Sequence, residues 1–123
     1  MLIRMIHHVQ IACPRGTEDV LRSFYSGLLG LAEKPKPAAL AGRGGCWFVG
    51  HDGIELHLGV EEPFVPARKA HPGLIWRDLD SLAARLTAVG HEVTWANDEL
   101  PGFRRFHAFD PHGNRLEFLE PTA

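Results

Sequence analysis

Two histidines and two glutamates recur along the chain at nearly equal intervals, and both residue types can bind a metal. His8 and His71 form one pair, Glu55 and Glu117 form the other, and the two intervals differ by a single residue. Imidazole nitrogens and carboxylate oxygens are common ligands of divalent transition metals. A fold of two similar halves, related by an approximate twofold axis, would bring all four side chains to one place. The spacing therefore predicts a site for one divalent ion, with these four residues as ligands.

The stretch GIELHLGV puts Glu55 and His57 two positions apart in an apolar run. In a strand these two side chains point to the same face, about two residue rises (roughly 6.6 Å) apart, so one small ion is within easy reach of only one of them. The repeat maps Glu55 onto Glu117. It maps His57 onto Leu119, which cannot ligate. We therefore predict that Glu55 lies nearer the ion. A mobile general base and a salt-bridged pocket carboxylate are alternative roles for Glu55, and His57 is expected to be a proton carrier or a substrate contact.

The turn signal DPHGN predicts a hairpin between the segments FRRFHAFD and NRLEFLE. We expect the register that pairs Phe109 with Arg115. In that register His107 lies opposite Glu117. The side chains of Arg105, His107 and Arg115 then point into the metal cavity, whereas a slip by one residue would turn all three outward.

Further roles can be assigned around the predicted ion. The candidate catalytic groups are Glu55, His57 and His107. The candidate substrate contacts are Gln10, Trp47, Arg105 and Arg115. Arg105 suggests a carboxylate or a phosphate on the substrate, and Trp47 fits core packing as well as a substrate platform.

The elements that position these residues follow the same order in both halves. In the first half, residues 6–13 alternate like a strand. A helix is expected between Thr17 and Gly30, with one apolar face formed by Val20, Leu21, Phe24 and Leu28. A Pro-rich connection and a hairpin over 46–60 follow. In the second half we expect a strand over 71–76, a helix over 77–90 with Leu79, Leu82, Ala83, Leu86 and Val89 inside, and strands over 91–98, 103–110 and 114–120. The prediction is one α+β domain, 1–123, with βαβββ modules at about 4–60 and 71–121 and a linker over 61–70.

Composition excludes several classes of partner. The 13 Lys and Arg against 15 Asp and Glu leave a net charge of −2, which argues against nucleic acid as a main partner. No apolar run approaches the roughly 20 residues of a membrane-spanning helix. The two cysteines have no CxxC spacing and are expected to be reduced thiols in a cytoplasmic protein.

Several motifs resemble those of the vicinal oxygen chelate superfamily, which includes glyoxalase I, the fosfomycin and bleomycin resistance proteins and the extradiol dioxygenases. The motifs are IHHVQIA, FYSGLLGLAE, IELHL, HPGLIWRDLDSLAARL and FDPHGNRLEFLEP, which together cover nearly the whole chain. The resemblance implies paired βαβββ modules with pseudo-twofold symmetry that form a half-open mixed sheet around a metal cavity, often completed across a homodimer. Its ligand positions fall on His8, Glu55, His71 and Glu117, whereas His57 lies outside the glyoxalase pattern.

The expected function is that of a metal-dependent enzyme acting on a small, possibly anionic molecule. One divalent ion per site (Fe, Mn, Ni, Co or Zn) would chelate two neighbouring oxygens of the substrate for isomerisation, addition or dioxygenation, in the manner of a glyoxalase-type lyase or a dioxygenase. A non-catalytic protein that sequesters a ligand, as bleomycin resistance proteins do, is the alternative. An empty scaffold with a regulatory or packing role is a third. We also expect a homodimer, because two open half-barrels leave apolar sheet surface and strand edges exposed.

Overall fold

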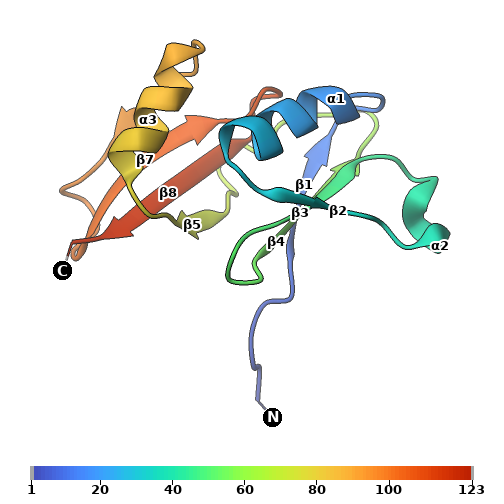
Figure 1. Cartoon of the computed structure of the whole chain (residues 1–123), viewed down its shortest axis with the longest axis horizontal. Coiled ribbons are helices and arrows are strands. Elements are labelled where there is room, and N and C mark those ends of the chain that lie inside the picture. Colours follow the sequence, from blue (N-terminus) through green and yellow to red (C-terminus); the bar gives the residue numbers. More distant parts are fainter. Residues whose placement is uncertain (1, 123) are drawn as a thin grey trace. The chain divides into compact units, whose positions relative to one another are not determined.

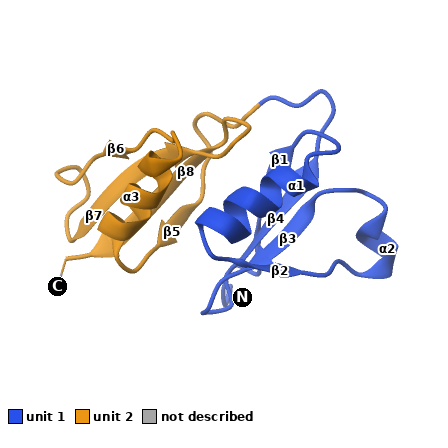
Figure 2. Cartoon of the chain, turned by 45° about the horizontal axis from the view of Figure 1, so that its top comes forward, with its two compact units in different colours: residues 1–65 blue, residues 66–123 orange. Residues whose placement is uncertain are grey.

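The computed structural model describes residues 2–122, which fold as two compact units, Met1–Val65 and Pro66–Ala123 (Figure 2). Unit 1 contains β1 (Val9–Cys13), α1 (Glu18–Leu21), its π-helical continuation η1 (Arg22–Leu28), β2 (Ala32–Lys34), α2 (Ala38–Ala41), β3 (Cys46–Val49) and β4 (Glu55–Val60). Unit 2 contains β5 (Gly73–Ile75), α3 (Leu79–Ala88), β6 (Thr94–Trp95), β7 (Phe103–Phe109) and β8 (Arg115–Pro121). Each unit runs strand, helix and three strands, with the short α2 inserted in unit 1. The predicted α+β fold of two βαβββ modules is confirmed.

The sheet of unit 1 is covered by its helix on one face. Its strands lie in the order β1-β4-β3-β2, with β1 parallel to β4 and the other pairs antiparallel. Alternation turns Ile11, Phe48 and Leu56 to the covered face, where they are buried. Tyr25 of η1 stacks on Phe48 with ring centroids 5.3 Å apart. Figure 1 shows α1 along this side of the sheet, so the opposite face is left for polar residues.

The helix of unit 1 differs from the predicted one in the residues that it buries. Val20 is exposed, whereas Tyr25 and Leu29 are buried although the helical spacing did not select them. The burial of Tyr25 and Leu29 follows from the π-helical geometry, in which the amide of Leu29 donates to the carbonyl of Phe24 at 3.0 Å, five residues back. Thr17 lies at the expected N-cap, but its hydroxyl donates to the carbonyl of Pro14 instead of accepting from the helix.

The Pro-rich connection folds more than the sequence indicated, since it contains β2 and α2. It ends at Gly45, whose φ of 80° lies in the left-handed region. A Cβ at Gly45 would lie 1.9 Å from the carbonyl oxygen of Leu58. Only glycine allows this close approach of the loop to β4, and the approach sets where β3 begins.

The sheet of unit 2 has the order β5-β8-β7-β6, which repeats that of unit 1. The register of β7 and β8 pairs Phe109 with Arg115 and His107 with Glu117, as predicted. Alternation buries Phe106, Leu116 and Phe118 on the other face. Arg105, His107 and Glu117 therefore share one face, and Phe106, Leu116 and Phe118 share the face that α3 covers (Figure 1). Arg104 also lies on the covered face, where its guanidinium donates to Asp80 of the helix.

Helix α3 is fixed at its first turn by side-chain oxygens. The carboxylate of Asp78 accepts from the amide of Ser81 at 3.2 Å, and Glu120 of β8 accepts from the amide of Asp78 at 2.8 Å. The buried stripe contains Leu79, Leu82 and Leu86, as expected. Val89 was expected in this stripe and is 59% exposed, because the helix ends at Ala88.

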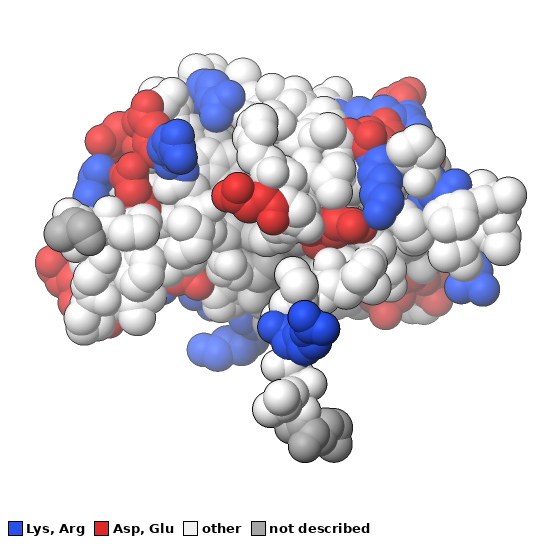
Figure 3. All heavy atoms as spheres, turned by 60° about the horizontal axis from the view of Figure 1, so that its bottom comes forward, with Lys and Arg blue, Asp and Glu red and all other residues white. Residues whose placement is uncertain are grey.

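Two surface features bear on possible partners. Within residues 2–122, no helix is long and apolar enough to cross a membrane. On the face drawn in Figure 3, basic and acidic side chains are interspersed, which agrees with the balanced composition.

The core of unit 2 gives a test of the fold. Leu82→Ala should lower the free energy of unfolding by about 2–5 kcal/mol, because Leu82 is fully buried under the sheet and the truncation leaves a cavity. Val89→Ala, one turn beyond the buried stripe, should change it by less than about 0.5 kcal/mol. Urea unfolding followed by circular dichroism measures both. Equal effects of the two variants would contradict the burial pattern.

Candidate metal centre

Three side chains on the open face of unit 2 could bind one ion. His71, His107 and Glu117 each offer one ligand atom, and these atoms all lie within 4.8 Å of one another. The β7–β8 register puts His107 directly opposite Glu117, and β5 puts Gly73 opposite Glu117 on the other side. A Cβ at Gly73 would lie 3.3 Å from Oε1 of Glu117. The glycine thus leaves space beside the carboxylate.

The segment that carries His71 is hydrogen-bonded to β8 along its length. The amide of Ala67 donates to the Asn114 side chain, and the amide of Arg115 donates back to the carbonyl of Ala67, both at 3.1 Å. The amide of Glu117 donates to the carbonyl of Pro72 at 3.1 Å. These bonds place His71 beside Glu117 although the two residues lie far apart in the sequence.

The imidazole of His71 is oriented as a metal ligand would be. Its Nδ1 lies 2.8 Å from the carbonyl oxygen of Lys69, which can only accept, so Nδ1 carries a proton. In the neutral ring Nε2 is then an unprotonated acceptor, and it lies 3.1 Å from Oε1 of Glu117, a second acceptor. Two lone pairs at this distance require a cation between them, either a proton or a metal ion. Ligating histidines commonly donate their second nitrogen to a backbone carbonyl in this way.

Arg105 provides the counter-charge for Glu117. Its Nη1 lies 2.5 Å from Oε2 of Glu117, and its Nη2 lies 2.8 Å from Oε2 of Glu99. Burial alone would raise the pKa of Glu117, but the hydrogen bond from Arg105 and the contact with His71 outweigh it and hold that pKa below its ordinary value. Burial, together with the charge of Arg115, lowers the pKa of His107. An ionised carboxylate and a neutral imidazole are the forms that bind metals.

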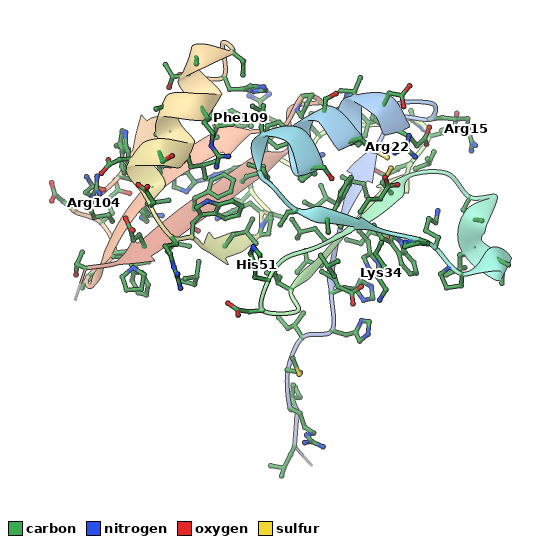
Figure 4. All side chains as sticks on the ribbon, in the orientation of Figure 1. Arg15, Arg22, Lys34, His51, Arg104 and Phe109 are labelled. Carbon is green, nitrogen blue, oxygen red and sulfur yellow. The ribbon has the colours of Figure 1, made fainter. Side chains whose placement is uncertain are left out.

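Unit 1 arranges its candidate residues around His57. His57 is 3% exposed and is stacked between the rings of His8 and Trp47, with both centroid distances 4.0 Å. Its Nε2 lies 3.0 Å from Oε1 of Glu55, and Nζ of Lys34 lies 3.1 Å from Oε2 of Glu55. Figure 4 shows Lys34 on the side of the sheet away from α1.

These contacts determine the charge states of Glu55 and His57. The hydrogen bond with His57 and the ammonium of Lys34 lower the pKa of Glu55 to about 2. Burial lowers the pKa of His57, and the bond to Glu55 opposes this only in part. At neutral pH the pair is therefore a carboxylate and a neutral imidazole.

The structure brings together part of the predicted ligand set. His71 and Glu117 meet in unit 2, whereas His8 and Glu55 belong to unit 1, where each contacts His57. The third member of the unit 2 cluster is His107, which the sequence suggested only as a proton carrier. Its position opposite Glu117 was the signal for ligation, but the repeat gave it no partner.

The remaining candidates lie on the open faces of their sheets. Gln10 and Trp47 flank His57 in the register of unit 1, so Trp47 belongs to the open face and not to the core. Arg105 and Arg115 share the face of Glu117 in unit 2.

The donor set in unit 2 fits a divalent transition metal. Two imidazoles and one carboxylate are ligands for Fe(II), Mn, Co, Ni or Zn, whereas Ca²⁺ and Mg²⁺ prefer oxygen-rich sets. The group would lie on an open sheet face, where solvent or substrate can reach it.

Comparisons with known proteins agree on the fold. Neither a protein-family model nor a curated protein sequence matches the chain. A Bacillus anthracis crystal structure, described as a glyoxalase family protein, is 42% identical over 99% of this chain and 98% of that chain, with a TM-score of 0.93. A glyoxalase/dioxygenase from Nostoc punctiforme is 21% identical over 98% of this chain and 92% of that chain, with a TM-score of 0.78.

An antibiotic-binding protein, TnmS3 from Streptomyces sp. CB03234, is 21% identical over 98% of this chain and 100% of that chain, with a TM-score of 0.72. At this identity the Nostoc and Streptomyces proteins show a common fold and nothing of a common activity.

The lowered pKa of Glu55 gives a pH test of unit 1. A carboxyl whose pKa falls from 4.5 to about 2 on folding stabilises the fold fully above pH 4.5, and this contribution is lost as the pH falls toward 2. Lys34→Met should raise the pKa of Glu55, and Lys69→Met in unit 2 should not. NMR titration of the side-chain carboxyl in chelator-treated protein measures this. A wild-type Glu55 that titrates near 4.5 would contradict the arrangement.

Proposed function

The chain belongs to the vicinal oxygen chelate superfamily, and on that premise we propose that it is a metal-dependent enzyme acting on a small molecule with two neighbouring oxygens. The observation that carries this proposal is the cluster of His71, His107 and Glu117, in which the Nδ1 of His71 is held by the Lys69 carbonyl. These three residues would hold the ion. That His8 and Glu55 also ligate stays a prediction from the sequence, and the metal measurement below tests it.

The chemistry divides between the ion and the chain. A bound divalent ion supplies a Lewis acid for the two oxygens of the substrate. Proton transfer by Glu55 and His57 stays a prediction from the sequence; within unit 1 the imidazole is neutral and its Nε2 shares a hydrogen bond with the carboxylate. Arg105 keeps Glu117 ionised and aligned. The reaction class we propose is isomerisation, addition or dioxygenation.

Non-catalytic ligand binding is the second candidate. The observation that favours it is the ring column of His8, His57 and Trp47, which offers a stacking surface for a flat molecule. TnmS3, described as an antibiotic-binding protein, has a role of this kind. Turnover of a bound compound that requires metal favours the enzyme, and stoichiometric binding without product in both metal-free and metal-loaded protein favours the binder.

Metal content tests the proposed centre directly. Protein stripped with chelator and reloaded with Co²⁺ should bind one ion per chain. His71→Ala, His107→Ala and Glu117→Gln should each weaken binding at least about tenfold, because each removes a donor from the set. His51→Ala removes an exposed turn histidine (Figure 4) and should have no effect.

Equilibrium dialysis with elemental analysis and visible absorption of Co²⁺ provide the readouts. Full metal content in all three variants would refute the centre. In the same assay, loss of metal from His8→Ala and Glu55→Gln supports their predicted ligation, and retention removes both from the ligand set.

We also propose that the protein is a homodimer. Two features support this. β1 and β5 are the terminal strands of their sheets, and an edge strand can pair with another chain. The segment before β1 carries Leu2, Ile3, Met5 and Ile6, whose exposed fractions range from 73% to 91%. Such a run of exposed apolar side chains typically marks an interaction surface.

Sedimentation velocity tests the assembly. We expect a dimer at micromolar concentration, and a shift toward monomer when Ile3 and Met5 are both replaced by Ser, because the substitution removes apolar area. Val65→Ser, which alters a similarly exposed apolar residue, should leave the dimer intact. A monomeric wild-type chain would contradict the proposal.

A further inference from the structure

We propose that the pocket of unit 1 beside Trp47 binds a small planar carboxylate. This site goes beyond the proposed function, because it uses residues of unit 1 alone. The pocket has a volume of about 220 Å³ and is lined by Gln10, Lys36, Leu40, Arg43, Gly44 and Trp47, together with part of β4. Pockets that bury a drug-sized ligand measure about 300–1,000 Å³, so this one suits a smaller molecule or one end of a substrate.

Two residues that line the pocket are register neighbours of His57. Trp47 and Gln10 lie on the strands to either side of β4, and both are register partners of His57. Gln10 reaches over Gly59, where a Cβ would lie 3.0 Å from its Cδ. The absence of a side chain at Gly59 thus lets the Gln10 amide lie across β4 toward the pocket.

Two cations line the pocket from the loop between β2 and β3. Lys36 is half-buried, and its Nζ donates to the carbonyl of Gly44, which holds the ammonium across the loop. Arg43 is exposed at the end of the same loop. Within residues 2–122, neither forms an ion pair with a carboxylate. An ammonium has three donors and a guanidinium five, so both retain donors for a ligand.

One acidic group affects this charge. Oε2 of Glu18 accepts from the amide of Gly45 at 2.9 Å, and the charge of Lys36 contributes to the lowered pKa of Glu18. Glu18 already has a backbone partner and does not line the pocket. Two cations against one neighbouring carboxylate leave the pocket positive, which favours an anion.

The indole of Trp47 selects a flat body for that anion. His57 stacks on the indole at 4.0 Å with an interplanar angle of 8°, so His57 covers one face of the ring. Trp47 also lines the pocket, with Leu40 as an apolar wall. A planar molecule gains stacking there while its carboxylate meets the cations.

Benzoate and benzamide test the inference, since they share a ring and differ in charge. In isothermal titration of chelator-treated wild-type chain, benzoate should bind at least about tenfold more tightly than benzamide, and added NaCl should weaken benzoate alone. Lys36→Met and Arg43→Gln should each weaken benzoate severalfold and leave benzamide unchanged. Lys69→Met and Arg68→Gln, the matched changes in unit 2, should have no effect.

Stacking has a separate readout. Trp47→Phe should weaken both probes, and circular dichroism of each variant checks the fold. Equal affinity for benzoate and benzamide, or no benzoate binding, would overturn the proposal. Inorganic phosphate that competes as strongly as benzoate itself would overturn the planar-carboxylate assignment.

The outcome is separable from the metal test. If His71→Ala and Glu117→Gln lose the ion but still bind benzoate, the pocket stands as a site of unit 1. If all the predicted ligand variants keep the metal while benzoate binding follows Lys36 and Arg43, the metal proposal fails and the pocket proposal stands. If the metal binds as proposed but benzoate binding does not depend on charge, the metal proposal stands and the pocket proposal fails.

Discussion

The structure depends on the two-residue alternation of its strands, because each sheet has only one face covered by a helix. In β4, Leu56 and Leu58 are buried against the helix of unit 1, and the residues between and before them, His57 and Glu55, face the other way. In β8, Leu116 and Phe118 flank Glu117 in the same manner. A slip of one residue would bury a carboxylate in the core at a cost of several kcal/mol. The apolar faces therefore determine which face of each sheet carries Glu55, His57 and Glu117.

In both units one oxygen of a glutamate contacts an imidazole and the other oxygen contacts a cationic side chain. Oε1 of Glu55 meets an imidazole and Oε2 meets Lys34. Oε1 of Glu117 meets an imidazole and Oε2 meets Arg105. The imidazole, however, comes from different places: His57 is two residues along the same strand, whereas His71 comes from the segment before the neighbouring strand. Only the second arrangement brings a further imidazole, His107, to the carboxylate.

That divergence explains how far the sequence could predict the site. Patterning and turn chemistry were enough for the order of elements and for the β7–β8 register, because both depend on local signals. The place of His107 in the unit 2 cluster was missed because its equivalent in unit 1 is Val49: His107 pairs with Glu117 and Val49 pairs with Glu55. Comparison of the two halves finds residues that both halves share, and it misses a residue such as His107 that occurs in only one of them. Tyr25 and Leu29 were missed for another reason, since a π-helical segment changes which residues face the sheet.

Arg105 affects how strongly Glu117 can attract an ion, because it already binds one oxygen of that carboxylate. A carboxylate offers about four lone-pair sites, so Glu117 can keep Arg105 on Oε2 while Oε1 remains available on the side of His71. The guanidinium compensates part of the negative charge, which weakens the attraction for a cation. The same contact keeps Glu117 ionised and held in one orientation, which reduces the ordering needed when the ion arrives. Lys34 stands in the same relation to Glu55. In the proposed centre, such a balance at Glu117 would suit an ion that must also accept and release substrate oxygens.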